Sequence, residues 1–284
     1  MRFLAAVFAA IAFATTGAFA ETKVLRVAHQ SIGGDAIDPA QLNSVLVAHL
    51  LDNLIEPMLR YDYLARPLRL VPNTVDALPE ASEGGRVYTC RVKRGVFFAP
   101  DPAFKGKPRE LTAGDYAYSF RRLFDPKYKS SQFFIVDGKI AGADALRAAA
   151  LAGKVFDYDK PIPGLQVLDR YTLRITLNEP DLNFLHVLAQ QNLGAVAREV
   201  VEAYGDDVGQ HPVGTGPYYM VERHVGPLGG EERYRSGHGY LSLSLGRYRS
   251  GRGRGNRQPD RTGRPPSAWG CRFRPTRRHR SRWP

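Results

Sequence analysis

The chain has 284 residues, and its 40 Lys and Arg against 28 Asp and Glu give a formal net charge of +12, which by itself suggests a nucleic-acid partner. Its two cysteines are too few for a disulfide framework. After the N-terminal segment no stretch approaches the roughly 18 apolar residues that read as a membrane span, so we expect a soluble mature chain.

Residues 1–20 have the layout of a secretory signal peptide. Arg2 supplies a positive charge, an apolar run extends from Phe3 to Phe13, and the segment ends in the letters AFA, a small-x-small cleavage pattern. The apolar run is too short to cross a bilayer as a helix. Because Glu21 rather than Cys follows, a lipid anchor is not indicated. We expect a cleaved signal; the alternative is a buried N-terminal helix.

The segments that follow alternate between strand and helix patterns. Residues 23–29 (KVLRVAH) predict a first strand, and the glycine loop SIGGD comes directly after it. The run NSVLVAHLLDNLIEPML predicts a helix that is capped by Asn43 or Ser44 and stopped by Pro57. Residues 68–82 predict strand pieces and turns, and a Gly-Gly turn leads into an alternating strand at Val87–Val92.

The run LTAGDYAYSFRRLFDP predicts a second helix. Thr112 and Asp115 form the carboxylate version of a capping box, and Pro126 ends the helix. Its aromatic side chains are expected to pack in the core, whereas Arg121 and Arg122 are expected on a solvated face. The aromatic residues are Tyr116, Tyr118, Phe120 and Phe124.

The next elements are again mixed. Residues 163–180 predict two alternating strands joined at Asp169-Arg170, and the run DLNFLHVLAQQ predicts a helix after them. Residues 211–217 hold two prolines and two glycines, and a strand is expected from Tyr218. Strands and helices without a fixed repeat indicate an α/β or α+β domain. Cys90, inside a strand pattern, is expected to pack as a small hydrophobic residue rather than to bridge to Cys271.

The positive charge belongs to residues 225–284. Fifteen of the 40 basic residues and three of the 28 acidic ones lie there, so residues 1–224 hold 25 of each and carry no net charge. Val, Ile, Lys and Met do not occur after Val225, and apolar periodicity is lost except in YLSLSL. Such a segment cannot bury enough surface to order itself. Two interpretations stand: a disordered basic arm that binds phosphates, or a reading-frame slip in GC-rich coding DNA, which the abrupt loss of four residue types favours.

Five motifs in order carry a resemblance to a known family. They are LRVAHQSIGGDAIDPA, LIEPMLRYD, LVPNTVDALPEASEGGRVYTCRVKRGVFF, LTAGDYAYSFRRLFDP and PVGTGPYYMVE. Together they resemble the solute-binding proteins of bacterial ABC importers, family 5, the oligopeptide, dipeptide and nickel type. The resemblance covers residues 21 to about 224.

The resemblance implies an α/β, periplasmic-binding-protein-like fold of class II, in which two lobes close around a ligand. Only the N-terminal part, an incomplete lobe I, is recognisable, and a disordered C-terminal tail would follow it. The expected organisation is a signal peptide at 1–20, the lobe I part of the solute-binding domain at 21–224 and the basic tail at 225–284. An acidic residue of the second lobe, which holds the peptide amine in the family, has no counterpart here.

Two segments are the candidate ligand-binding residues. By resemblance the loop Ser31, Ile32, Gly33 and Gly34 faces the cleft, where its backbone could pair with an extended peptide. The alternative is a plain strand-to-helix connection. Gln132 and Phe133 match a stretch that carries an aromatic near the ligand in the family; the alternative is a core aromatic pair, which we favour for Phe134.

Nothing in the sequence indicates an enzyme, a cofactor or a metal site. None of the seven histidines stands in H-x-x-x-H or H-E-x-x-H spacing, and no G-x-S-x-G elbow occurs. The run Gly214–Pro217 lacks the Gly-Lys-Ser/Thr of a phosphate-binding loop.

The resemblance implies a periplasmic, monomeric receptor that binds short peptides and delivers them to an ABC permease complex at the inner membrane, with no specific nucleic-acid partner. Two alternatives remain. One is a truncated, binding-incompetent fragment whose exposed lobe interface would promote aggregation. The other is a secreted basic protein that binds nucleic acid or anionic surfaces through the tail, with binding that falls steeply with salt.

Overall fold

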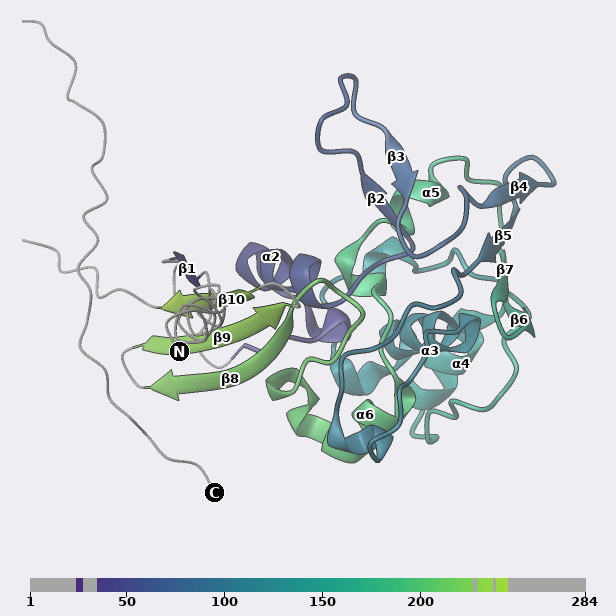
Figure 1. Ribbon diagram of the computed structural model, residues 1–284. Coiled ribbons are helices and arrows are strands. Elements are labelled where there is room, and N and C mark those ends of the chain that lie inside the picture. Colours follow the sequence, from purple (N-terminus) through teal and green to yellow (C-terminus); the bar gives the residue numbers. More distant parts are fainter. Residues whose placement is uncertain (1–23, 28–34, 227–228, 237–238, 245–284) are drawn as a thin grey trace, which may run out of the picture. The chain divides into compact units, whose positions relative to one another are not determined.

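The computed structural model describes residues 24–27, 35–226, 229–236 and 239–244. Within these ranges the strands form three sheets, with the orders β1-β10-β9-β8, β2-β3 and β4-β5-β7-β6 (Figure 1). The helices are α2 (Val45–Leu54), α3 (Ala113–Phe124), α4 (Ala143–Leu151), α5 (Phe184–Val187) and α6 (Arg198–Tyr204). No helix in these ranges is long and apolar enough to cross a bilayer.

The first sheet joins the two ends of the described chain. Strand β1 (Val24–Val27) lies parallel to β10 (Gly239–Ser244), which continues antiparallel through β9 (Gly229–Ser236) to β8 (Tyr219–Gly226). The domain boundary predicted at residue 224 therefore falls inside a strand. Strand backbone continues beyond it because the YLSLSL alternation and the glycines that bound β8, β9 and β10 suit tight antiparallel pairing. Residues 245–284 lie outside the described residues.

Helix α2 begins where the sequence predicts. Ser44 is its N-cap, and the Ser44 hydroxyl accepts the Val47 N–H at 3.2 Å. The helix ends at Leu54, before Pro57, and its C-terminal backbone is crossed closely by the loop at Gly214 and Gly216. A Cβ at Gly214 would stand 2.1 Å from the Leu54 carbonyl oxygen, so only glycine fits there. Strands β2 (Leu59–Tyr61) and β3 (Leu70–Pro72) then form a two-stranded hairpin.

The second four-stranded sheet contributes part of the core. Strands β4 (Glu80–Ser82), β5 (Val87–Arg91), β7 (Thr172–Thr176) and β6 (Leu165–Asp169) are antiparallel, and helix α3 packs against both β6 and β7 (Figure 1). Cys90 on β5 is buried and unbridged, as expected, and burial raises the pKa of its thiol to about 12. Cys271 lies outside the described residues.

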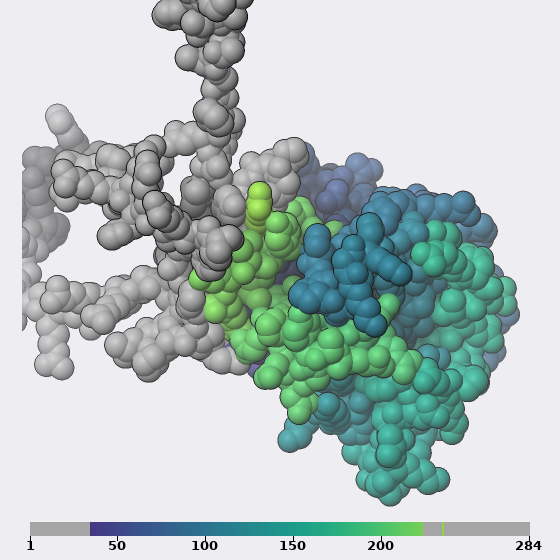
Figure 2. Space-filling model, turned by 60° about the horizontal axis from the view of Figure 1, so that its bottom comes forward, coloured from purple at the N-terminus to yellow at the C-terminus, as the bar shows by residue number. Residues whose placement is uncertain are grey.

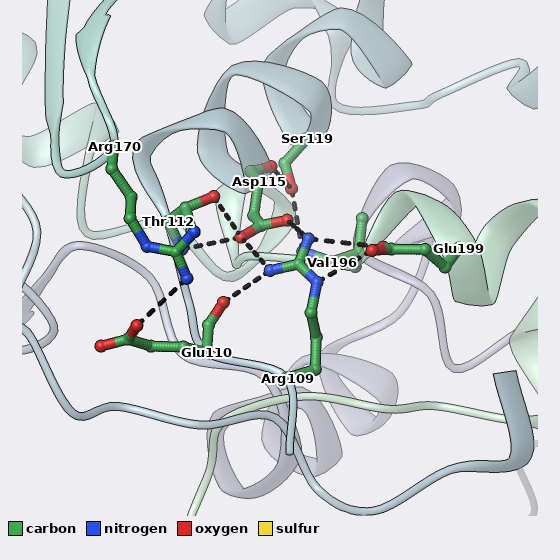
Figure 3. Close-up of polar contacts among 8 residues, drawn as sticks. All are labelled: Arg109, Glu110, Thr112, Asp115, Ser119, Arg170, Val196 and Glu199. Atoms are coloured by element: carbon green, nitrogen blue, oxygen red, sulfur yellow. Dashed lines mark hydrogen bonds and ion pairs between the residues drawn. The ribbon is translucent and has the colours of Figure 1, made fainter. Parts of the chain in front are cut away.

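The predicted capping box at the start of α3 is confirmed. The N–H and the hydroxyl of Thr112 donate to Asp115 Oδ2 at 2.7 and 2.8 Å. Figure 3 shows the Arg109 guanidinium between two carboxylates: it donates to Asp115 at 2.6 and 3.1 Å and to Glu199 of α6 at 2.9 Å. Ser119 extends the connection, because its Oγ accepts the Val196 N–H. The network fixes α3 to the segment that leads into α6.

The aromatic residues of α3 are buried as predicted, but Arg122 is not on a solvated face and Arg121 is so only in part. Arg122 is 1% exposed and forms an ion pair with Asp38, and Arg121 is half-buried and donates to the Tyr158 carbonyl oxygen at 2.8 Å. The expectation of a solvated face is wrong because Arg122 follows the buried Tyr118 by one helical turn. The carboxylate that compensates its charge comes from a segment far away in the sequence.

Candidate ligand-binding site

The glycine loop predicted to face a ligand, Ser31–Gly34, lies outside the described residues. The described chain resumes directly after it at Asp35, and Asp38 caps the short 3₁₀ helix η1 (Pro39–Gln41) by accepting the Ala40 N–H at 3.3 Å. Ile37 and Ala40 are buried, which anchors this segment on the core. The backbone just downstream of the loop is therefore held in place.

A hollow of about 520 Å³ opens beside this segment. One wall is the segment after the glycine loop, and the other is the turn between α3 and Gln132, which includes the 3₁₀ helix η3 (Pro126–Tyr128). The volume falls in the range of small-ligand pockets. The lining is mostly polar and comprises Asp35, Ala36, Gln41, Asn43, Lys127, Tyr128, Lys129 and Ser131.

A buried ion pair joins the two walls behind the hollow. Both terminal nitrogens of Arg122 donate to the Asp38 carboxylate at 2.7 Å, and both side chains are 1% exposed. Burial lowers the pKa of the Arg122 guanidinium, but the charge and hydrogen bonds of Asp38, together with Tyr128, outweigh burial and raise that pKa. The guanidinium also lies 4.2 Å from the ring centroid of Tyr128, a lining residue. The pair thus holds the aromatic wall against the segment that follows the glycine loop.

Two further contacts fix the second wall. Asp125 accepts the Lys127 N–H at 2.9 Å and the Tyr158 hydroxyl at 2.7 Å, and the Ser131 hydroxyl donates to the Leu42 carbonyl oxygen at 2.8 Å. The Ser131 bond ties the two walls together a second time. These contacts hold the two walls of the hollow in one arrangement.

Of the candidate residues, Gln132 follows the last lining residue of the hollow in the chain and Phe133 packs beside the core. Gln132 is half-buried next to Ser131, whose Oγ accepts its side-chain amide at 3.4 Å. The Phe133 ring meets Phe124 edge to face, and the Arg147 guanidinium covers it at 4.0 Å. A ligand contact for either residue stays a prediction. The core packing favoured for Phe134 is wrong: that side chain is 68% exposed.

Sequence reasoning missed most of the hollow. Asp38 stands in the pattern Asp-Pro, typical of an N-cap before a proline at the first helical position, and this signal was available. The pairing of Asp38 with Arg122 had no signal in one sequence, because the two residues are 84 positions apart.

A second, smaller hollow of about 360 Å³ lies between residues 99–101, 210–213 and 219–223. Figure 2 shows the face on which the blue segment around residue 100 meets the green segments near residues 205–220. The Tyr204 hydroxyl donates to Asp101 at 3.0 Å, and His211 stacks on the Tyr204 ring at 4.2 Å. No group of three or more potential metal ligands occurs within the ranges that the structure describes.

Comparison with known proteins places the chain in a family of bacterial solute-binding proteins. The profile of the bacterial extracellular solute-binding proteins, family 5 (middle region), matches residues 69–226, which is more than half of the chain. The chain therefore belongs to this family, and the resemblance carried by the five motifs is confirmed.

Individual relatives agree with this assignment. Di/tripeptide-binding protein 2 of Pseudomonas aeruginosa is 27% identical over 223 residues, which cover 74% of this chain and 38% of that protein. Periplasmic oligopeptide-binding protein OppA of Escherichia coli is 27% identical over 174 residues, which cover 60% of this chain and 28% of that protein. The chain thus spans about two-fifths or less of the length of these relatives.

Solved structures confirm the expected fold. Listeria monocytogenes OppA bound to peptide superposes with a TM-score of 0.65 at 17% identity, over 80% of this chain and 43% of that one. The unliganded open form of the murein tripeptide-binding protein MppA gives a TM-score of 0.63 at 22% identity, over 80% and 42%. The α/β, periplasmic-binding-protein-like fold is therefore present over two-fifths of the length of these structures.

Proposed function

We propose that the chain is the ligand-binding part of a peptide receptor for an ABC importer. The observation that carries the proposal is the hollow between the segment that directly follows the predicted glycine loop and the turn that directly precedes Gln132. Membership of family 5 supports binding rather than catalysis, because the matched relatives are named as binding proteins.

The finer parts of the proposal rest on the family and on the N-terminal segment. Residues 1–20 act as a cleaved export signal, the protein works as a monomer in the periplasm, and it passes short peptides to a permease complex at the inner membrane. The domain limits proposed are 21–224 for the binding part and 225–284 for the basic tail, whose first strands, β9 and β10, continue the sheet that contains β8. The ligand would pair with the backbone of Ser31–Gly34 and contact Gln132 and Phe133.

A thermal-shift titration of the full chain tests this function. A ligand that binds only the folded state raises the melting temperature, and the rise grows with the logarithm of ligand concentration above the dissociation constant. We expect mixtures of di- and tripeptides to raise it, and equal concentrations of free amino acids to raise it less. A melting temperature unchanged by every peptide mixture would support the binding-incompetent fragment instead.

The nucleic-acid alternative predicts a different result, and the charge of residues 225–284 is the observation that favours it. Binding of a labelled oligonucleotide through that tail would fall steeply between low and high salt because it releases counterions. Peptide binding at the hollow would show a much weaker salt dependence. The two titrations, run on the same preparation, separate the two functions.

A further inference from the structure

We propose that Lys129 binds a carboxylate of the peptide ligand and so selects among peptides, an inference that rests on the proposed function. Lys129 lines the hollow and is exposed. It ends η3 in the left-handed backbone conformation, with φ of 46°, and its N–H donates to the Pro126 carbonyl oxygen at 3.1 Å. Its backbone is therefore fixed at the wall of the hollow, and its side chain is exposed.

The other charges on this wall already have partners. Lys127 forms an ion pair with Asp206 at 2.8 Å, and Arg122 forms one with Asp38. Asp125 accepts hydrogen bonds from Lys127 and from Tyr158. Lys129 makes no ion pair with any residue that the structure describes, so it is the cation of this wall whose charge remains available.

Neutral donors lie on the facing wall. The side-chain amides of Gln41 and Asn43 line the hollow and form no hydrogen bond with another described residue. The Ser131 hydroxyl proton is committed to Leu42. An ammonium group with amide N–H groups opposite is a donor set that suits a carboxylate.

Asp35 limits where that carboxylate can lie. It also lines the hollow, and a ligand anion close to it would be repelled. No ion pair joins Asp35 to Lys129 among the described contacts, so a ligand carboxylate can approach the lysine without displacing Asp35. The carboxylate is placed on the Lys129 side, and it can be an acidic side chain or the C-terminus of the peptide.

The chain offers a matched control for Lys129. Lys105 ends the 3₁₀ helix η2 (Pro102–Phe104) in the same way: an Asp-Pro start, a left-handed backbone with φ of 54°, and an N–H that donates to the first proline of the turn. Lys105 is exposed and lines neither hollow described above. Lys105→Gln therefore removes the same charge from the same backbone setting, at a position outside the hollow.

The experiment is calorimetric titration of the full-length wild type, Lys129→Gln and Lys105→Gln, with a melting curve of each to show that it folds. The probes are Ala-Ala-Ala, its C-terminal amide, and the three tripeptides with one Glu, each beside its Gln counterpart. The amide identifies a terminal carboxylate and the Gln peptides identify a side-chain carboxylate.

We expect wild type to prefer the carboxylate form in one of the two sets by roughly two- to fivefold, the size expected of an exposed charge pair. Lys129→Gln should lose the preference, and Lys105→Gln should keep it. If Lys129→Gln binds every peptide as wild type does, the assignment of Lys129 is refuted while the proposed function survives. Binding of no peptide by wild type would refute both.

Discussion

Removal of Asp38 is expected to destabilise the protein far more than removal of a surface acid. The Asp38 and Arg122 side chains are each 1% exposed, and two 2.7 Å hydrogen bonds join them. Asp38→Asn keeps the shape of the side chain but leaves the guanidinium buried without a counter-charge. Breaking a buried pair on one side costs about 3–5 kcal/mol.

The consequence can be measured as a melting temperature. For a chain of this size each kcal/mol shifts the melting temperature by about 2–4 °C, so Asp38→Asn should lower it by roughly 6–20 °C. Urea denaturation followed by circular dichroism gives the free energy of unfolding directly. The double variant Asp38→Asn/Arg122→Met should recover much of the loss, because it also removes the uncompensated charge.

Asp206→Asn is the matched control. Asp206 pairs with Lys127 on the surface, with side chains 85% and 57% exposed, so its loss should cost no more than about 1 kcal/mol. The reasoning fails if Asp38→Asn costs as little as Asp206→Asn. It also fails if the double variant is as unstable as the single one, because the damage would then come from lost packing rather than from an isolated charge.

Three further predictions follow from buried groups. Burial raises the pKa of the Glu56 carboxyl above its ordinary value of 4.5, so the stability contributed by the protonated carboxyl is present below pH 4.5 and is lost as the pH rises through the folded-state pKa. Glu56→Gln should therefore gain stability relative to wild type between pH 4.5 and 7. An equal difference in urea midpoint between the two proteins at both pH values would contradict this. Gly214→Ala should destabilise the protein strongly, because the new Cβ would stand 2.1 Å from the Leu54 carbonyl oxygen. Gly114→Ala is the control, because the nearest atom to a Cβ there is 3.5 Å away. Similar melting temperatures for the two variants would refute the steric argument. The Cys90 thiol is buried and its pKa is raised to about 12, so it should react with a thiol reagent only after unfolding. Rapid labelling of both cysteines in the native protein would be inconsistent with the fold.

Local signals were enough to predict most elements. Ser44 and Thr112 begin helices as their capping chemistry requires. The alternation in residues 163–180 gives the β6–β7 hairpin, whose turn lies at Arg170-Tyr171, one residue after the predicted joint. These features depend on residues a few positions apart, so one sequence contains them. The order of the five motifs added the family and, with it, the fold.

Long-range contacts were not predictable in the same way. The burial of Arg122 depends on Asp38 arriving from the other side of the hollow, and the exposure of Phe134 depends on its neighbour Phe133 taking the place on the core. Likewise the hollow exists only where two segments meet. The sequence indicated Ser31–Gly34 and Gln132-Phe133, which adjoin the walls, but not the lining residues Tyr128 and Lys129. Each of these errors or omissions concerns tertiary packing, which overrides local pattern.

Site-mapped photocrosslinking tests the central claim most directly. A tripeptide that carries a benzophenone side chain would be irradiated with the full-length protein, and the modified residues would be located by mass spectrometry. The account predicts adducts in residues 31–43 and 127–133, competed away by unlabelled tripeptide. Adducts confined to the second hollow or to residues 245–284, or adducts that unlabelled peptide does not reduce, would contradict the proposal that this chain binds peptides between those two segments.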